Sequence, residues 1–513
     1  RLSGLVRDQV YANVFGAGGM MDAFFVAFRI PNFMRRLSAE GSFSMAFVPV
    51  LAEYKATRSA DEVKALVDRV AGTLTAALLV LTAIVILLAP QLARVIAPNF
   101  DPAQMVMLTD LLRVTFPYAL FISLASLVGA ILNSYQRFAI PALSPVLLNL
   151  AMITAALAAR EWFDSSVMVL GWGVFAAGML QLAFQLPSLA RLGLLPRPRL
   201  DFAHAGVRRI LTLMVPTLFG SSVAQINLLL DTVIAAKLTD GSQSWLSLAD
   251  RFLELPLGVF GVALGTVILP ALARHHVSTD KAGFSSALDW GLRMTLLISV
   301  PAMLGLLLLA EPLIATIFQH GQFSAFDTRM TALSVYGLSF GLPAFALLKV
   351  VLPAFYARQD TRTPVRAGVA ALVANMVFNF ALLAVLYQVM VPDELKAQGV
   401  MAALGKQPGL HLALGIASAL SSYLNLGLLW YWLGKTDVYQ RRPGWGGYLL
   451  RLLLACTAMV GVLLALLYWL PGFSSMGVWE RIGALGLLVG GGGLTYLLAM
   501  VAMGFRPRDL RGH

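Results

Sequence analysis

The sequence predicts an all-α protein that crosses a membrane many times. Of its 513 residues, 58% are hydrophobic and only 12% are charged, and the mean hydropathy is +0.78. A soluble domain carries about 25% charged residues. Apolar runs of roughly 20 residues, each long enough to span a bilayer as one helix, recur to the end of the chain. Together these observations exclude a soluble globular protein.

Glycine, proline and charge clusters divide the chain into about fourteen apolar segments. We expect the first to be incomplete, because only about 15 residues precede the glycine cluster at 16–19 and a span needs about 20. No cleavable signal peptide is expected, since the chain opens without an apolar h-region. The segments lie at 1–16, 22–52, 70–97, 106–134, 140–159, 166–189, 210–236, 246–273, 288–317, 330–356, 364–388, 409–433, 447–470 and 482–504.

The basic residues predict the orientation of these segments. The formal net charge is +12, and a basic chain can bind nucleic acid, but here the charge lies in short loops between apolar runs. With fourteen spans, loops on one side hold about 22 Lys and Arg and those on the other about 5. This asymmetry places both termini in the cytoplasm and argues against a nucleic-acid partner.

An internal repeat is visible in the sequence. Residues 48–54 match residues 269–275 at an offset of 221, and residues 135–137 match residues 356–358 at the same offset. The matches fall at equivalent segment ends, which indicates a six-helix unit used twice in one orientation. The two units would be related by a pseudo-two-fold axis along the membrane normal, as in many transporters.

The repeat defines the expected domains. An N-terminal lobe would cover 1–190, a C-terminal lobe 207–435, and a final helix pair 445–505 would lie outside the repeat.

Several ionisable side chains fall inside apolar segments, where each costs roughly 2.5–3.5 kcal/mol and therefore belongs beside a partner or a cavity. The cations come from both halves of the chain, so the two-fold arrangement would bring them to one central cleft. Arginine binds phosphate in a bidentate manner and keeps its charge in a partly dry site. A phosphorylated, anionic substrate is therefore expected. The cations are Arg1, Arg7, Arg35, Arg251 and Lys349.

The alternative is that the arginines pair with acids close by in the sequence. Arg1 and Lys349 have no such acid in their own segments, so this alternative does not explain the whole set. The local pairs would be Arg7 with Asp8, Arg35 or Arg36 with Glu40, and Arg251 with Glu254.

A second site is suggested by Asp231, Asn375 and Asn379. A carboxylate with amide oxygens suits Na⁺, and Asp231 would alternatively carry a coupling proton. A hydrogen-bond network between helices is the other interpretation.

No enzymatic constellation is present in the sequence. The single cysteine, Cys456, lies in an apolar run, and the glycines at 490–493 lack the Lys-Ser/Thr of a phosphate loop. No cofactor is expected. Because no nucleotide-binding motif is present, Na⁺, H⁺, the membrane potential or another protein would supply the energy for transport.

The opening run carries motifs that are specific to one protein family, and further matches extend over essentially the whole chain. They are Arg7-Asp8, FGAG at 15–18, DAFFVAF at 22–28, IPN at 30–32, Arg35-Arg36, AEG at 39–41 and AFVP at 46–49, then residues 249–251, 261–266, 318–321, 323–327 and 355–360. On these residues the chain resembles the MurJ (MviN) family, the lipid II flippases of the multidrug/oligosaccharidyl-lipid/polysaccharide exporter superfamily.

The resemblance implies two lobes around a central cavity and a lipid-tail groove formed by the last two helices. It implies that Arg1, Arg7, Arg35 and Arg251 contact the pyrophosphate and the sugar-peptide head, and that Lys349 assists them or helps to close a gate. Some relatives have a Na⁺ site that Asp231, Asn375 and Asn379 would match, although Asn379 stands where an acid is expected. Gating or supporting roles are implied for Asp8, Asp22, Asn32, Glu40, Asp250 and Glu254.

The expected function is therefore that of a lipid II flippase of the bacterial inner membrane, which serves peptidoglycan synthesis, cell-wall biogenesis and cell shape. Its expected partners are lipid II, the phospholipid bilayer and proteins of cell-wall synthesis and division. The alternatives are a flippase for another polyprenyl-linked polysaccharide, a cation-coupled multidrug exporter, and a scaffold or glycosyltransferase of the cell-wall machinery.

Overall fold

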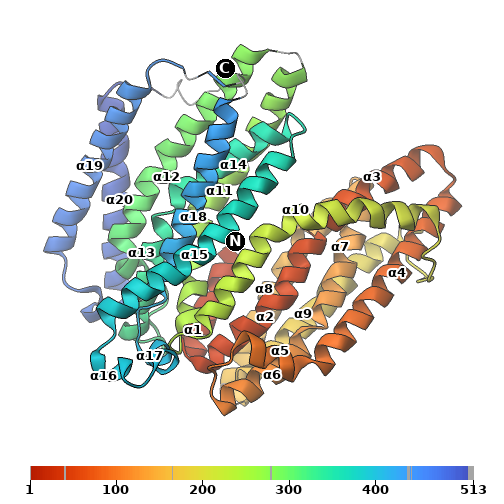
Figure 1. Ribbon diagram of the computed structural model, residues 1–513, viewed down its shortest axis with the longest axis horizontal. Coiled ribbons are helices and arrows are strands. Elements are labelled where there is room, and N and C mark those ends of the chain that lie inside the picture. The colour runs from red at the N-terminus through yellow and green to blue at the C-terminus, as the bar shows by residue number, and fades with distance from the viewer. Residues whose placement is uncertain are drawn as a thin grey trace. The chain divides into compact units, whose positions relative to one another are not determined.

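The computed structural model describes residues 2–39, 42–163, 166–277, 280–435, 439–440 and 442–506. All regular structure in this part of the chain is helical (Figure 1). The helices up to residue 277 are α1 Leu2–Phe15, α2 Gly19–Ala39, α3 Ser42–Thr57, α4 Ala60–Leu87, α5 Ala89–Ile96, α6 Pro102–Thr115, α7 Tyr118–Ser134, α8 Ala139–Trp162, α9 Met168–Ala190, α10 Ala205–Ala235 and α11 Ser242–Val277. The remainder are α12 Lys281–Ile317, α13 Ala325–Ser339, α14 Leu342–Tyr356, α15 Arg362–Met390, α16 Asp393–Lys396, α17 Val400–Lys406, α18 Leu412–Gly434, α19 Trp445–Trp469, the 3₁₀ turn η1 Phe473–Ser475, and α20 Val478–Ala502.

The chain is an all-α, multi-pass membrane protein, as predicted. Among the described residues nine helical segments are long and apolar enough to cross a membrane, and the pair α13–α14, bent by 41°, makes a tenth. The count of fourteen spans stays a prediction. Every expected segment nevertheless coincides with one helix or with two consecutive helices.

Prolines mark several of the breaks between consecutive helices. Pro117 follows α6, and Pro343 lies in the first turn of α14. Proline lacks the N–H that a continuous helix needs, so a helix ends or bends where it occurs. The second expected segment comprises α2 and α3, and Glu40 and Gly41, between these helices, lie outside the described residues.

The contacts divide the chain into two compact units, Arg1–Ser244 and Trp245–His513. In the first unit α8 packs on α9 and α1, α7 packs on α9 and α2, and α10 packs on α3 (Figure 1). In the second, α15 packs on α18, α12 on α13 and α14, and α19 on α20. The domain ranges expected from the repeat stay a prediction.

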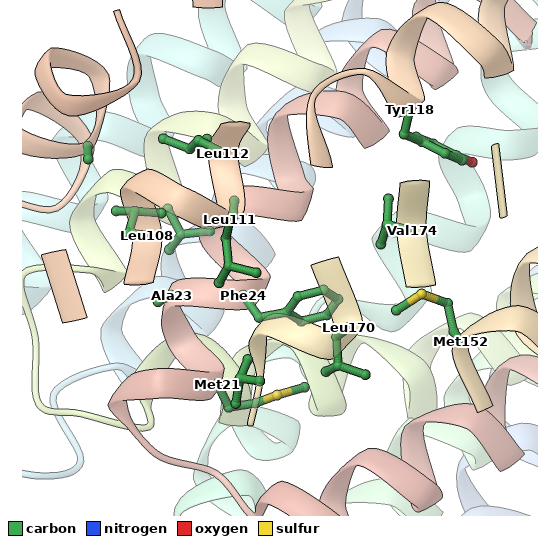
Figure 2. Close-up of a cluster of buried hydrophobic side chains, with 14 of the residues drawn as sticks. Met21, Ala23, Phe24, Leu108, Leu111, Leu112, Tyr118, Met152, Leu170 and Val174 are labelled. Atoms are coloured by element: carbon green, nitrogen blue, oxygen red, sulfur yellow. The ribbon is translucent and has the colours of Figure 1, made fainter. Parts of the chain in front are cut away.

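Helix α2 is the central element of one core of the first unit. Met21, Ala23 and Phe24 are all buried there, together with side chains from α6, α7, α8 and α9 (Figure 2). The Phe24 ring stacks on Phe28 with centroids 5.8 Å apart, and Phe28 approaches Tyr118 of α7 at 6.1 Å. Because lipid is as apolar as these side chains, close van der Waals packing holds the helices together. This packing fixes α2, which carries several of the predicted site residues.

The two halves share an unusual turn. Gln136 and Gln359, both at φ 59°, are the only non-glycine residues with positive φ in the described part of the chain, and they follow α7 and α14. In each turn the next N–H, that of Arg137 or Asp360, bonds to the carbonyl five residues earlier, at 2.9 and 3.1 Å. This is the hydrogen bond of a Schellman helix ending.

The repeat stays a prediction, and the two turns are related by a different offset from the one that its sequence matches give. Gln136 and Gln359 are 223 residues apart (359 − 136), and not 221. The sequence comparison aligned the pattern Tyr-x-Arg by residue identity, but this pattern occupies different positions in the two turns.

The C-terminal helix pair is attached to α12 by buried polar contacts. The Asp289 carboxylate accepts hydrogen bonds from Trp445 Nε1 at 2.7 Å and from the Tyr439 hydroxyl at 3.0 Å, and it forms an ion pair with Arg293 at 2.8 Å. At the other end of α12, the buried Arg481 of α20 donates to the carbonyl oxygens of Ala315 at 3.0 Å and of Gln319 at 3.3 Å. A guanidinium suits a helix C-terminus, where carbonyls lack partners and the helix dipole is negative.

We expect Arg481→Met to lower the free energy of unfolding by about 2 kcal/mol or more, because hydrogen bonds to charged groups contribute about 1.5–3 kcal/mol each. Arg451→Met, at an exposed position of α19, is the matched control and should change little. Thermal denaturation of the purified protein, followed by the loss of the monodisperse gel-filtration peak, measures the difference. Equal midpoints for the two variants would show that Arg481 does not stabilise the helix pair.

Candidate functional site

Arg7 lies at the centre of a buried polar network between α1 and α8. Its Nε and Nη2 donate to Asp8 Oδ1 at 2.9 and 2.7 Å, and its Nη1 donates to Asn149 Oδ1 at 3.1 Å. Asn149 in turn donates to the Ser3 hydroxyl at 2.8 Å. Arg7 is only 7% exposed. The local Arg7–Asp8 pair that the sequence suggests is therefore present, and Asn149 holds the guanidinium from a second helix.

Arg35 lies in α2. Its Nε donates to Asn32 Oδ1, one turn earlier, at 2.9 Å. The structure brings Arg35 together with Asn32, and its role in binding an anionic group stays a prediction.

Asp22 has a structural role that the sequence does not reveal. Its carboxylate, 2% exposed, accepts the backbone N–H groups of Gly241 and Ser244 at 2.8 Å each and the Ser244 hydroxyl at 2.5 Å. These bonds satisfy N–H groups at the start of α11 that have no partner within the helix. Asp22 thereby fixes the first turn of α2 to the segment that follows α10.

In the second unit, the predicted cations lie on neighbouring helices. Arg251 Nη1 donates to Glu254 Oε2 at 2.9 Å, which is the local pair that the sequence suggests, and Asp250 lies in the same turn of α11. Lys349 of α14 donates to the backbone carbonyl of Leu257 in α11 at 3.5 Å. The substrate-binding and gating roles of these residues stay predictions.

Two predicted site residues, Arg1 and Glu40, lie outside the described residues. The pairing of Arg35 or Arg36 with Glu40 is therefore not described by the structure.

The residues of the predicted Na⁺ site belong to different units. In the first, Asn227 Nδ2 lies 3.5 Å from Asp231 Oδ2. In the second, Asn375 and Asn379 are both fully buried, and Asn375 Oδ1 accepts from the Ser421 hydroxyl at 3.4 Å. Within the described residues no group of three or more His, Cys, Asp or Glu side chains could hold a metal ion. The Na⁺ site stays a prediction.

Arg29 is a charged residue of α2 that the sequence interpretation did not single out. Its Nε donates to the Thr232 hydroxyl of α10 at 3.1 Å. An arginine inside the apolar run 24–30 is itself the signal that would have found it, because such a charge needs a polar partner.

Asp327, in one of the further segments that match the family, has a structural role. Its carboxylate accepts Trp245 Nε1 at 3.0 Å and the N–H and hydroxyl of Ser324 at 2.9 and 2.7 Å. It completes a capping box at the start of α13.

Known proteins resemble this chain over most of its length. The family model described as lipid II flippase MurJ matches residues 11–478. A protein of Vibrio cholerae serotype O1, called probable lipid II flippase MurJ, is 41% identical over 522 residues, which cover 100% of this chain and 95% of the relative.

Solved structures share the fold. One titled lipid II flippase MurJ, inward closed conformation, has a TM-score of 0.78 at 23% identity and covers 99% of this chain and 97% of that chain. An inward-facing multidrug resistance MATE family transporter of the MOP superfamily has a TM-score of 0.66 at 12% identity, over 85% of this chain and 94% of that chain.

Proposed function

Because this chain belongs to the MurJ family of lipid II flippases, we propose that it moves lipid II from the cytoplasmic to the outer leaflet of the inner membrane. The observation that carries the proposal is the family match over residues 11–478. Its many apolar helices and this family make it a multi-pass inner-membrane protein. Peptidoglycan synthesis would use the lipid II that it delivers.

The predicted cationic side chains would bind the negatively charged head of the substrate. In this proposal the pyrophosphate is bound by Arg7 and Arg35 of the first unit and by Arg251 and Lys349 of the second. Each arginine already donates to an acid or amide oxygen. A pyrophosphate would compete for these donors, and it would shift the conformational equilibrium only through its differential affinity for the inward-open and outward-open states.

The remaining features of the proposal follow from the family and the charge pattern. Both termini would lie in the cytoplasm, and α19 with α20 would hold the lipid tail. Transport would involve no enzymatic step on the substrate and would draw on Na⁺, H⁺ or the membrane potential. Proteins of cell-wall synthesis and division would be its partners.

The test is to deplete the protein in its host and add an external enzyme that cleaves only outward-facing lipid II. We expect lipid II in spheroplasts to become resistant on depletion. Wild type should restore cleavage and Arg251→Ala should not, because the pyrophosphate would lose one donor.

Arg113→Ala is the matched control, since Arg113 also forms an i,i+3 pair, with Asp110 at 3.3 Å, but lies outside the proposed site. It should restore cleavage fully at equal protein level. Unchanged cleavage on depletion, in a host without a second flippase, would contradict the proposed function. It would favour another polyprenyl-linked cargo or drug export.

A further inference from the structure

The segment between α9 and α10, residues 191–204, has a surface that the transport proposal does not use. We call this segment the strap. It has no regular secondary structure, yet it is attached to α4 at several points. The Arg197 N–H donates to Asp68 Oδ1 at 2.7 Å, and the Arg199 N–H donates to the Asp68 backbone carbonyl at 3.1 Å.

Further contacts hold the strap close to α4. Arg69 Nε donates to Asp201 Oδ2 at 2.9 Å. Gly72 permits the close approach, because a Cβ at this position would lie 2.3 Å from the Arg199 carbonyl oxygen. Leu194 anchors the strap by packing into the apolar core that includes Leu66. The strap therefore has a defined path across α4.

Its outward side chains are unusual for a loop in water. Leu195, Leu200 and Phe202 are 46%, 65% and 59% exposed. Arg191, Arg197 and Arg199 lie in the same segment and are also exposed. An exposed surface that combines large apolar side chains with arginines is typical of segments that lie in a membrane interface.

The position of the strap along the helices agrees with this interpretation. It begins directly after α9, a span that ends at Ala190. It crosses α4 at residues 68–72, where the polar first turns of that helix give way to its apolar run. The end of α9 and the polar start of α4 therefore both place the strap at the depth of the lipid headgroups.

The charge of the strap is positive. Its acid, Asp201, is bonded to Arg69 and to the N–H groups of Ala203 and His204. Burial and the charge of Arg69 lower the pKa of His204, so this imidazole adds little charge at neutral pH. Within the described residues, no ion pair involves the three exposed arginines of the strap.

We propose that the strap is an interfacial anchor for anionic phospholipid. Its three exposed apolar side chains enter the boundary between headgroups and acyl chains, and its three arginines bind lipid phosphates. Near an anionic leaflet each arginine contributes about 1 kcal/mol, which is roughly a fivefold preference for anionic over neutral lipid. This interaction requires no lipid II.

The test uses the full chain in vesicles without lipid II. A fluorophore is attached to Leu200→Cys or to Ala60→Cys, while the native Cys456 is buried. Ala60 begins α4 about ten residues before the apolar run, roughly 15 Å along the helix. Nitroxide-labelled lipid should quench the fluorophore at 200 several-fold more than the one at 60. Replacing part of the phosphatidylcholine with phosphatidylglycerol should increase quenching at 200 further.

Two variants separate the parts of the proposal. Arg191→Gln/Arg197→Gln/Arg199→Gln keeps the backbone bonds of the strap and should abolish the increase with phosphatidylglycerol. Arg58→Gln/Lys281→Gln/Arg362→Gln removes the same charge from exposed positions elsewhere and should keep most of that increase. Equal quenching at 200 and 60, or an equal loss in both triple variants, would overturn the proposal. Neither result would bear on lipid II transport, because the readout contains no substrate.

Discussion

Replacing Arg7 with alanine is expected to abolish growth of cells that depend on this protein. The proposed site would lose a guanidinium that contributes to binding the pyrophosphate, and losing one partner of a buried charged pair costs about 2–5 kcal/mol, or roughly 30-fold to several thousand-fold in affinity. The variant also leaves the carboxylate of Asp8, itself 2% exposed, without its arginine. Complementation of a depletion strain, with immunoblots for protein level, measures the result.

A double variant separates transport from folding. In Arg7→Ala/Asp8→Asn, the buried carboxylate is replaced by a neutral amide, so thermal stability should recover most of what Arg7→Ala loses. Growth should not recover, because the pyrophosphate would still lack its guanidinium. If the double variant supports growth as well as Asp8→Asn alone, Arg7 serves only its local pair and the proposed role is wrong.

The second large effect is expected at Asp22. Asp22→Ala leaves two N–H groups and the Ser244 hydroxyl without their acceptor. Unsatisfied buried donors cost about 1–3 kcal/mol each, so we expect the free energy of unfolding to fall by about 3–5 kcal/mol and the folded yield to fall with it. Thermal denaturation of the purified variant measures the loss.

Ser244→Ala is the control for Asp22→Ala, because it removes only the hydroxyl bond and leaves both backbone N–H groups bonded to the carboxylate. Its expected loss is about 1 kcal/mol. Equal stability of Asp22→Ala and Ser244→Ala would show that the carboxylate contributes little to this turn. Of the roles expected for Asp22, only gating would then remain.

The fold class could be predicted from the sequence because hydropathy alone determines which segments enter a bilayer. Local ion pairs could be predicted for a similar reason. Helix geometry places residues three or four apart on one face, so the spacing of Arg251 and Glu254 is enough to predict that they pair.

Contacts between distant segments could not be predicted in this way. Arg7 and Asn149 are 142 residues apart, and Asp22 and Ser244 are 222 apart. Such pairs depend on which helices pack together and at which rotation, and neither hydropathy nor helical period determines this. For that reason the sequence predicts Asp22 only as a gating or supporting residue, and the bonds that it accepts from backbone N–H groups are visible only in the fold.

The left-handed turns at Gln136 and Gln359 also show how little of these two corners depends on the exposed side chains. A left-handed residue with a side chain costs roughly 1 kcal/mol relative to glycine, so the surrounding structure must offset that cost in both turns. The residues that follow differ in charge, Arg137 in one turn and Asp360 in the other, while the same backbone hydrogen bond forms in both. The two corners therefore share the course of the main chain and present opposite charges to their surroundings.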